Sequence, residues 1–165
     1  MDNTTITEKP LIVGVGEFAV SHTKGQVLKT FSLGSCVAVC ALAPSVSIAG
    51  LLHVQLPDSK IPNSAFPPSA FADTGIQLLF KEMRRQGCEK YSLVKIKIVG
   101  GANTLGEQNS IEVGKKNILA VKKTLWQFGL GPLAEDVGGE IPRTVEIVTG
   151  FDMVTITNGS NKWYI

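Results

Sequence analysis

The stretch "FSLGSCVAVCALA", residues 31–43, has the apolar character of a buried strand but is interrupted early by Gly34, Ser35 and Cys36. Glycine inside a strand gives up packing and raises the entropy cost of ordering, so it usually marks a bulge or a close approach of the backbone to another group. We therefore expect a strand pair or one bent strand over residues 27–42. If the approaching group is a substrate, Cys36 is the residue that meets it.

A second apolar strand, "SIAGLLHVQLP" at residues 47–57, carries His53 and stops at Pro57. The proline-rich stretch that follows, residues 58–69, has the composition of an irregular loop. Cys36 and His53 lie 17 positions apart, across one strand-turn-strand excursion. This spacing allows the two side chains to meet.

Two amphipathic helices are predicted further along the chain. The first should begin at an N-cap, Ser69, and close at Gly87. The core faces are marked by apolar residues at helical spacing: Ala72, Ile76, Leu79 and Met83 in the first helix, and Ile118, Val121, Leu125 and Phe128 in the second.

The remaining patterns indicate strands. Residues 11–20 indicate a strand with glycine interruptions, residues 93–99 alternate as a half-buried strand that feeds a glycine turn, and residues 143–157 predict a hairpin about Thr149 and Gly150. Because strands and helices follow one another without a regular βαβ repeat, we expect an α+β fold with mixed β-sheets. We expect a flexible leader at residues 1–10 and a single domain over residues 11–165.

Composition excludes several classes of protein. The chain has 165 residues, 44% of them hydrophobic and 18% charged, which is typical of a globular domain that needs no disulfide to fold. The net charge of +2 is mild, and the lysines at 115, 116, 122 and 123 are explained as the solvent face of one helix, so we expect no nucleic-acid partner.

No apolar run approaches the ~18 residues that span a bilayer, and residues 1–10 lack the order of a signal peptide, so we expect a cytoplasmic protein without membrane insertion. The three cysteines, an odd number without metal-ligand spacing, indicate reduced thiols. Dispersed carboxylates predict no metal site, and we expect no cofactor. The stretch "IVGGANTLGE" lacks the complete pattern of a phosphate-binding loop and indicates a tight turn.

Nucleophilic catalysis is the chemistry that a Cys36 and His53 pair would support. A histidine next to the thiol would stabilise the thiolate, lowering its pKa below the ~8.5 of free cysteine, and would later protonate a leaving group. The alternative is that Cys36 is a small buried hydrophobe and His53 a hydrogen-bonded core residue. Cys40 and Cys88 are expected to be structural, and His22 is expected to be exposed.

The sequence resembles the CheD family of chemoreceptor glutamine deamidases in several blocks that occur in the same order. These blocks are "VGVGEFAVS", "LKTFSLGSCVAV", "GLLHVQLPDS", "VKIKIVGGANTL", "EVGKKN" and "AEDVGGE". The resemblance implies a catalytic trio of Cys36, His53 and Thr30, and a fold like the catalytic domain of the cytotoxic necrotizing factor toxins. One departure is Pro142 before Arg143, where the family has glycine, so the local turn should differ.

The resemblance implies hydrolysis of glutamine side-chain amides to glutamates on the cytoplasmic helices of methyl-accepting chemotaxis receptors. His53 would take the proton from Cys36, Thr30 would orient the imidazole, and backbone N–H groups of Ser35 and Cys36 would hold the oxyanion. Gly34 would leave room for the glutamine side chain. A CheC-type phosphatase is implied as a second partner. Two alternatives stay open: a thiol methylesterase acting on the same receptor sites, and a regulatory binding module.

Overall fold

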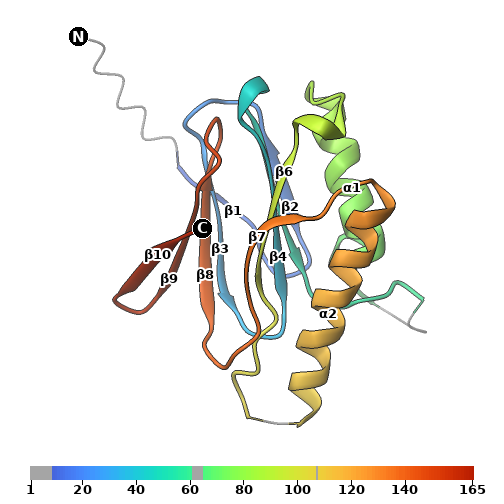
Figure 1. The fold of residues 1–165 in the computed structure, drawn as a ribbon, viewed down its shortest axis with the longest axis vertical. Helices are drawn as coiled ribbons and strands as arrows, with labels where there is room; N and C mark the ends of the chain where they lie inside the picture. Colours follow the sequence, from blue (N-terminus) through green and yellow to red (C-terminus); the bar gives the residue numbers. More distant parts are fainter. Residues whose placement is uncertain (1–8, 61–64, 107) are drawn as a thin grey trace.

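The computed structural model describes residues 9–60, 65–106 and 108–165, which form three layers (Figure 1). One outer layer is a sheet in the order β1 (Leu11–Ile12), β3 (Val27–Leu33), β8 (Arg143–Val148), β9 (Val154–Asn158) and β10 (Asn161–Tyr164). The central layer is a sheet in the order β2 (Phe18–Ser21), β5 (Ile48–Val54), β4 (Val37–Ala43), β6 (Lys95–Gly100) and β7 (Pro132–Val137). Helices α1 (Ala72–Arg85) and α2 (Gln108–Gln127) cover its other face. Short 3₁₀ turns occur at Pro44–Val46, Pro68–Ala70 and Tyr91–Leu93.

The central sheet is buried on both faces, which explains the continuous apolar runs of its middle strands. Every residue of β4 and β5 is buried. Because side chains alternate along a strand, Val37 and Val39 pack toward the helices, whereas Ala38 and Cys40 pack between the two sheets. The expected α+β class with mixed sheets is confirmed, since both sheets contain parallel and antiparallel pairs.

Residues 27–42 form two strands, β3 and β4, that belong to different sheets. A bulge follows Thr30, where Thr30 faces Val145 and Leu33 faces Arg143, and within it Ser32 adopts a left-handed φ of 50°. Residues 34–36, which we call the Cys36 turn, then carry the chain from the outer sheet to the central one. The interruption in the sequence therefore marks the crossing between sheets.

The predicted helix faces are confirmed, but one helix start is wrong. The core face of α1, from Ala72 to Met83, is buried as expected, and Gly87 follows the helix with a φ of 117°. Ser69 is not the N-cap: it lies in the preceding 3₁₀ turn, and its hydroxyl donates a hydrogen bond to the carbonyl of Gly16 at 2.6 Å. The helix begins instead after Phe71, without a side-chain cap.

Long-range pairing accounts for the other differences. The predicted strand over residues 11–20 is two strands, β1 and β2, one in each sheet, separated by a turn at residues 14–17. β7 lies parallel to β6 after the α2 crossover, and β10 closes the outer sheet. The hairpin of β8 and β9 is confirmed.

The leader expected at residues 1–10 falls mostly on residues 1–8, which lie outside the described residues. Lys9 is described, and its carbonyl accepts a hydrogen bond from Nε2 of Gln26 at 2.9 Å. Within the described chain, neither helix is both long and apolar enough to cross a membrane.

Candidate active site

Thr30 and His53 meet between the two sheets. Thr30 lies on β3 of the outer sheet and His53 on β5 of the central sheet; both are buried, and Thr30 Oγ1 lies 2.7 Å from His53 Nδ1. The Thr30 hydroxyl also donates to the Val13 carbonyl at 2.7 Å. A hydroxyl has one proton, so Nδ1 must carry the hydrogen and donate to Thr30. Nε2 is then the unprotonated nitrogen, and it is buried without a hydrogen-bond partner among the described residues.

Cys36 lies beside His53 on the same face of the central sheet. Ala38 is directly opposite His53 in the β4–β5 ladder, and Cys36 precedes Ala38 by two residues. Diagonal neighbours of this kind have Cα atoms roughly 7–8 Å apart, within reach of a long side chain. Cys36 packs against the core between the sheets and is half-buried, whereas Cys40 and Cys88 are buried. Cys36 is therefore the cysteine that combines access with a neighbouring imidazole.

Burial determines the protonation of both groups. It raises the pKa of the Cys36 thiol and lowers the pKa of His53 to about 4, although the Glu17 carboxylate acts on His53 in the opposite direction. The expectation of a lowered thiol pKa is therefore wrong for this structure, because desolvation of Cys36 dominates. The resting pair is a thiol and a neutral imidazole that do not share a hydrogen bond. A neutral imidazole can act as a general base at pH 7.

The carbonyl groups of the Cys36 turn are held by donors from elsewhere in the fold. The carbonyl of Gly34 accepts from the Ala102 N–H at 2.7 Å, that of Ser35 from Asn117 Nδ2 at 3.0 Å, and that of Cys36 from the Gly101 N–H at 2.8 Å. Three consecutive carbonyl groups are thus hydrogen-bonded. Hydrogen bonds from the segment that follows β6 and from α2 therefore hold the Cys36 turn in place.

Glycines allow this close packing. A Cβ at Gly100, whose φ is 115°, would overlap the carbonyl oxygen of Cys36, so only glycine fits there. A Cβ at Gly34 would lie 3.2 Å from Oγ1 of Thr104. The side chain next to Gly34 in this structure is therefore Thr104, from the loop that leads to α2.

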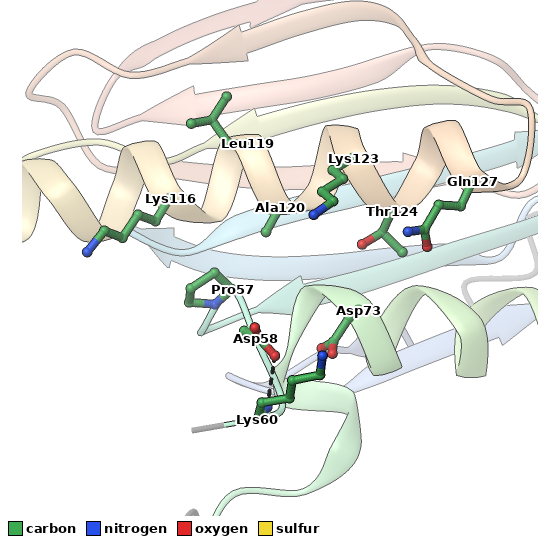
Figure 2. Close-up of a pocket in the computed structure, with 10 residues that line it drawn as sticks. All are labelled: Pro57, Asp58, Lys60, Asp73, Lys116, Leu119, Ala120, Lys123, Thr124 and Gln127. Carbon is green, nitrogen blue, oxygen red and sulfur yellow. Dashed lines mark hydrogen bonds between the residues drawn. The ribbon is translucent and has the colours of Figure 1, made fainter. Parts of the chain in front are cut away.

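A groove of about 480 Å³ lies beside helix α2 (Figure 2). It runs between residues 57–60, which follow β5, and one side of α2, where Lys116, Lys123 and Thr124 line it. Asp73 projects toward the groove from the start of α1 and binds the backbone N–H and hydroxyl of Ser59. Thr30, Cys36 and His53 are absent from its lining, so the groove is separate from these candidate residues.

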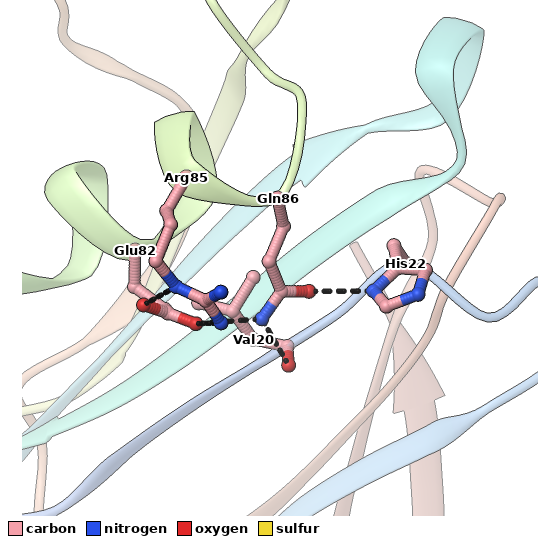
Figure 3. Close-up of polar contacts among 5 residues, drawn as sticks. All are labelled: Val20, His22, Glu82, Arg85 and Gln86. Carbon is pink, nitrogen blue, oxygen red and sulfur yellow. Dashed lines mark hydrogen bonds and ion pairs between the residues drawn. The ribbon is translucent and has the colours of Figure 1, made fainter.

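His22 is exposed, as expected. Its Nδ1 is 3.0 Å from Oε1 of Gln86 at the end of α1, beside the ion pair of Glu82 and Arg85 (Figure 3). Pro142 directly precedes β8, and its carbonyl accepts from Asn158 Nδ2 at 2.6 Å. Among the described residues, no group of three histidine, cysteine or acidic side chains is arranged to hold a metal ion.

Sequence reasoning assigned no role to Asn117, which contacts the Cys36 turn. The residue is part of the quoted block "EVGKKN", and a helical phase places it four positions before Val121 and eight before Leu125, on the buried face. A polar residue on an apolar helix face was the signal that could have identified it.

Comparisons with known proteins agree with the resemblance. The family described as CheD chemotactic sensory transduction matches residues 55–158. A protein of Syntrophotalea carbinolica named "Probable chemoreceptor glutamine deamidase CheD" is 45% identical over 159 residues, covering 94% of this chain and 98% of its own. The "Chemoreceptor glutamine deamidase CheD" of Thermotoga maritima is 39% identical over 153 residues, covering 92% and 94%. A relative with the same "Probable" name from Archaeoglobus fulgidus is 34% identical over 157 residues, covering 93% and 97%.

Proposed function

The chain belongs to the CheD family, and from this we propose that it is a protein-glutamine deamidase that acts on chemoreceptors. The observation that carries the proposal is the arrangement between the sheets, where Thr30 contacts His53 and Cys36 is the diagonal neighbour of His53 across β4 and β5. A thiol, an imidazole with a free Nε2 and a hydroxyl that orients the imidazole are the groups that amide hydrolysis through a thioester requires.

In the proposed mechanism, Nε2 of His53 takes the proton of the Cys36 thiol as sulfur attacks the amide carbon of a glutamine. The negative charge that develops on the amide oxygen would be held by backbone N–H groups at Ser35 and Cys36. The imidazolium then gives its proton to the departing ammonia. Water, activated by the same imidazole, cleaves the thioester and releases glutamate with the thiol restored.

The proposed substrate is a glutamine on the cytoplasmic helices of a methyl-accepting receptor. Exposed apolar side chains from separate segments of the chain support docking of an amphipathic helix around the Cys36 turn. Phe31 adjoins Thr30, Leu105 adjoins Thr104, and Val15 lies in the turn that hydrogen-bonds the His53 backbone. Deamidation of the cytoplasmic part of a receptor would require the protein to be in the cytoplasm. A CheC-type phosphatase is proposed as a second partner on the strength of the resemblance.

The test is incubation of the protein with receptor cytoplasmic fragments, followed by peptide mass spectrometry. Conversion of specific glutamines to glutamates is expected with the parent and not with Cys36→Ala. A parallel incubation with fragments that carry glutamate methyl esters distinguishes the methylesterase alternative. Ester hydrolysis without glutamine conversion would replace the proposed deamidase by an esterase, and no reaction with either fragment would leave a binding module.

A further inference from the structure

Asn117 is a buried polar residue of α2 that connects both strands of the proposed site. It is fully buried, and its Nδ2 donates to the Ser35 carbonyl at 3.0 Å and to the Gln55 carbonyl at 3.1 Å. Ser35 directly precedes Cys36, and Gln55 follows His53 by two residues. One amide group therefore holds the end of β5 and the beginning of β4 against the helix.

The orientation of this amide follows from its neighbours. Both contacts are carbonyl oxygens, which only accept hydrogen bonds, so the NH₂ group must face them. Oδ1 is left buried without a hydrogen-bond partner among the described residues. An apolar residue would avoid this unsatisfied acceptor, so an asparagine here is explained by its two N–H donors and not by packing.

The contact with Ser35 fixes the direction of the next peptide N–H. In a trans peptide the C=O and N–H bonds point in opposite directions. The Ser35 carbonyl points to α2, so the Cys36 N–H in the same peptide points away from α2. The Cys36 side chain and His53 lie on that far side, between the two sheets. Among the described residues, no backbone carbonyl accepts a hydrogen bond from the Cys36 N–H, which leaves it available to an oxyanion.

We propose that Asn117 is a positioning residue that aims the Cys36 N–H at the oxyanion formed during amide hydrolysis. The catalytic consequence of this inference rests on the proposed deamidase function. The two hydrogen bonds from Asn117 to Ser35 and Gln55, which we call the clamp, are a property of the fold. Asn117 does not touch the substrate; it acts through the Ser35–Cys36 peptide.

The variants are Asn117→Ala and Asn117→Leu, both of which remove the N–H donors, with Val121→Ala as the matched control. Val121 is also fully buried on the same face of α2, one turn later, and contacts the core instead of the turn. Deamidation of the receptor fragment gives kcat and KM. The rate of Cys36 alkylation by iodoacetamide is measured as well, because displacement of iodide from the CH₂ carbon of the reagent forms no oxyanion.

Removing a single oxyanion donor typically lowers kcat by ~10²–10³, and a donor that is displaced should cost less, so we expect a fall of about 10- to 100-fold in both Asn117 variants. KM and the alkylation rate should change by less than about threefold, since neither depends on the oxyanion. Val121→Ala should keep the parental kcat. Parental kcat in a folded Asn117 variant, or equal loss of deamidation and alkylation, would overturn the proposal.

An activity-independent measurement separates this inference from the function. In isotope-labelled protein, the amide ¹⁵N shift of Cys36 and the carbonyl ¹³C shift of Ser35 report the hydrogen bond to that carbonyl. Both shifts should move in the Asn117 variants and stay in place in Val121→Ala. Unchanged shifts would refute the clamp. If the Asn117 substitutions move these shifts but the parent protein converts no glutamine, the deamidase proposal is refuted and the clamp is retained.

Discussion

Oγ1 of Thr30, on the outer sheet, lies 2.7 Å from Nδ1 of His53, on the central sheet. The bulge that follows Thr30 changes the alternation of β3, so that both Thr30 and Leu33 point inward. Because the Thr30 hydroxyl gives its own proton to Val13, the contact selects one tautomer of His53 and leaves Nε2 free on the side of Cys36.

Thr30→Val tests this orientation. Valine keeps the volume and the β-branched shape but offers no acceptor to Nδ1, so the fold should persist while the imidazole loses its tautomer preference. We expect a fall in kcat of about 10- to 100-fold, part of the ~10²–10⁴ that a positioned base contributes. Glutamine conversion is measured together with thermal unfolding, so that a folding defect is recognised.

Thr30→Ser is the control, because it keeps the hydroxyl and should retain much of the activity. A valine variant as active as the parent would reduce Thr30 to a packing residue and leave a dyad of Cys36 and His53.

His53 predicts a dependence of stability on pH. Its pKa is about 4 in the folded protein and ~6.5 in the unfolded chain, so between these values the unfolded chain binds a proton that the folded protein does not. The free energy of unfolding should therefore fall as the pH drops from ~6.5 to ~4, by about 3 kcal/mol in total from this group.

Urea unfolding of the parent and of His53→Gln at a series of pH values isolates this contribution. The difference between the two proteins should shrink as the pH falls through the window, because glutamine does not titrate. A constant difference would show that His53 is protonated to the same extent in both states.

Cys36 predicts slow labelling at low pH. Burial raises the pKa of its thiol, and no imidazolium ion lies beside it to lower that pKa, so iodoacetamide should label Cys36 appreciably only above pH ~8.5, the pKa of free cysteine.

Cys36→Ser should lower deamidation by several orders of magnitude, since the nucleophile is lost. Cys40→Ala, on the same strand but fully buried, should cost roughly 1–2 kcal/mol of stability and leave turnover intact.

Rapid labelling of Cys36 at pH 6 would contradict the resting state of thiol and neutral imidazole. Retained deamidation by Cys36→Ala would exclude the thioester mechanism altogether.

Hydrophobic periodicity predicted much of the fold. The faces of α1 and α2 and the hairpin of β8 and β9 follow from spacing within short windows, where local preference and burial agree. The partition of β3 and β4, and of β1 and β2, between two sheets depends on pairing between distant segments, which a local pattern does not contain. Ser69 failed as an N-cap because its hydroxyl binds Gly16, a contact made by tertiary structure.

The candidate site was predicted through family resemblance more than through spacing. A cysteine and a histidine 17 residues apart fit a buried core equally well, and Thr30 alone fits ordinary β-propensity. Asn117 was not identified: its place on the buried face of α2 marked it as unusual, but its partners are backbone carbonyls, which the sequence does not reveal. The prediction that the pKa of Cys36 is lowered was wrong, because burial of the thiol raises this pKa. The extent of burial is known only from the structure.

Gly100→Ala tests whether the Cys36 turn depends on close backbone packing behind it. An alanine Cβ would overlap the carbonyl oxygen of Cys36 while its backbone is held at a φ of 115°, so strain and steric overlap act together. We expect a loss of about 3 kcal/mol or more in the free energy of unfolding, with deamidation falling as well because Cys36 is displaced.

Gly129→Ala is the matched control: its φ is 71°, but a Cβ there meets no atom within 4 Å. It should lose only about 1–2 kcal/mol from the left-handed conformation and keep its activity. Urea unfolding and glutamine conversion are measured for both variants. Equal losses of stability would mean that the conformation of Gly100 matters and its contact with Cys36 does not.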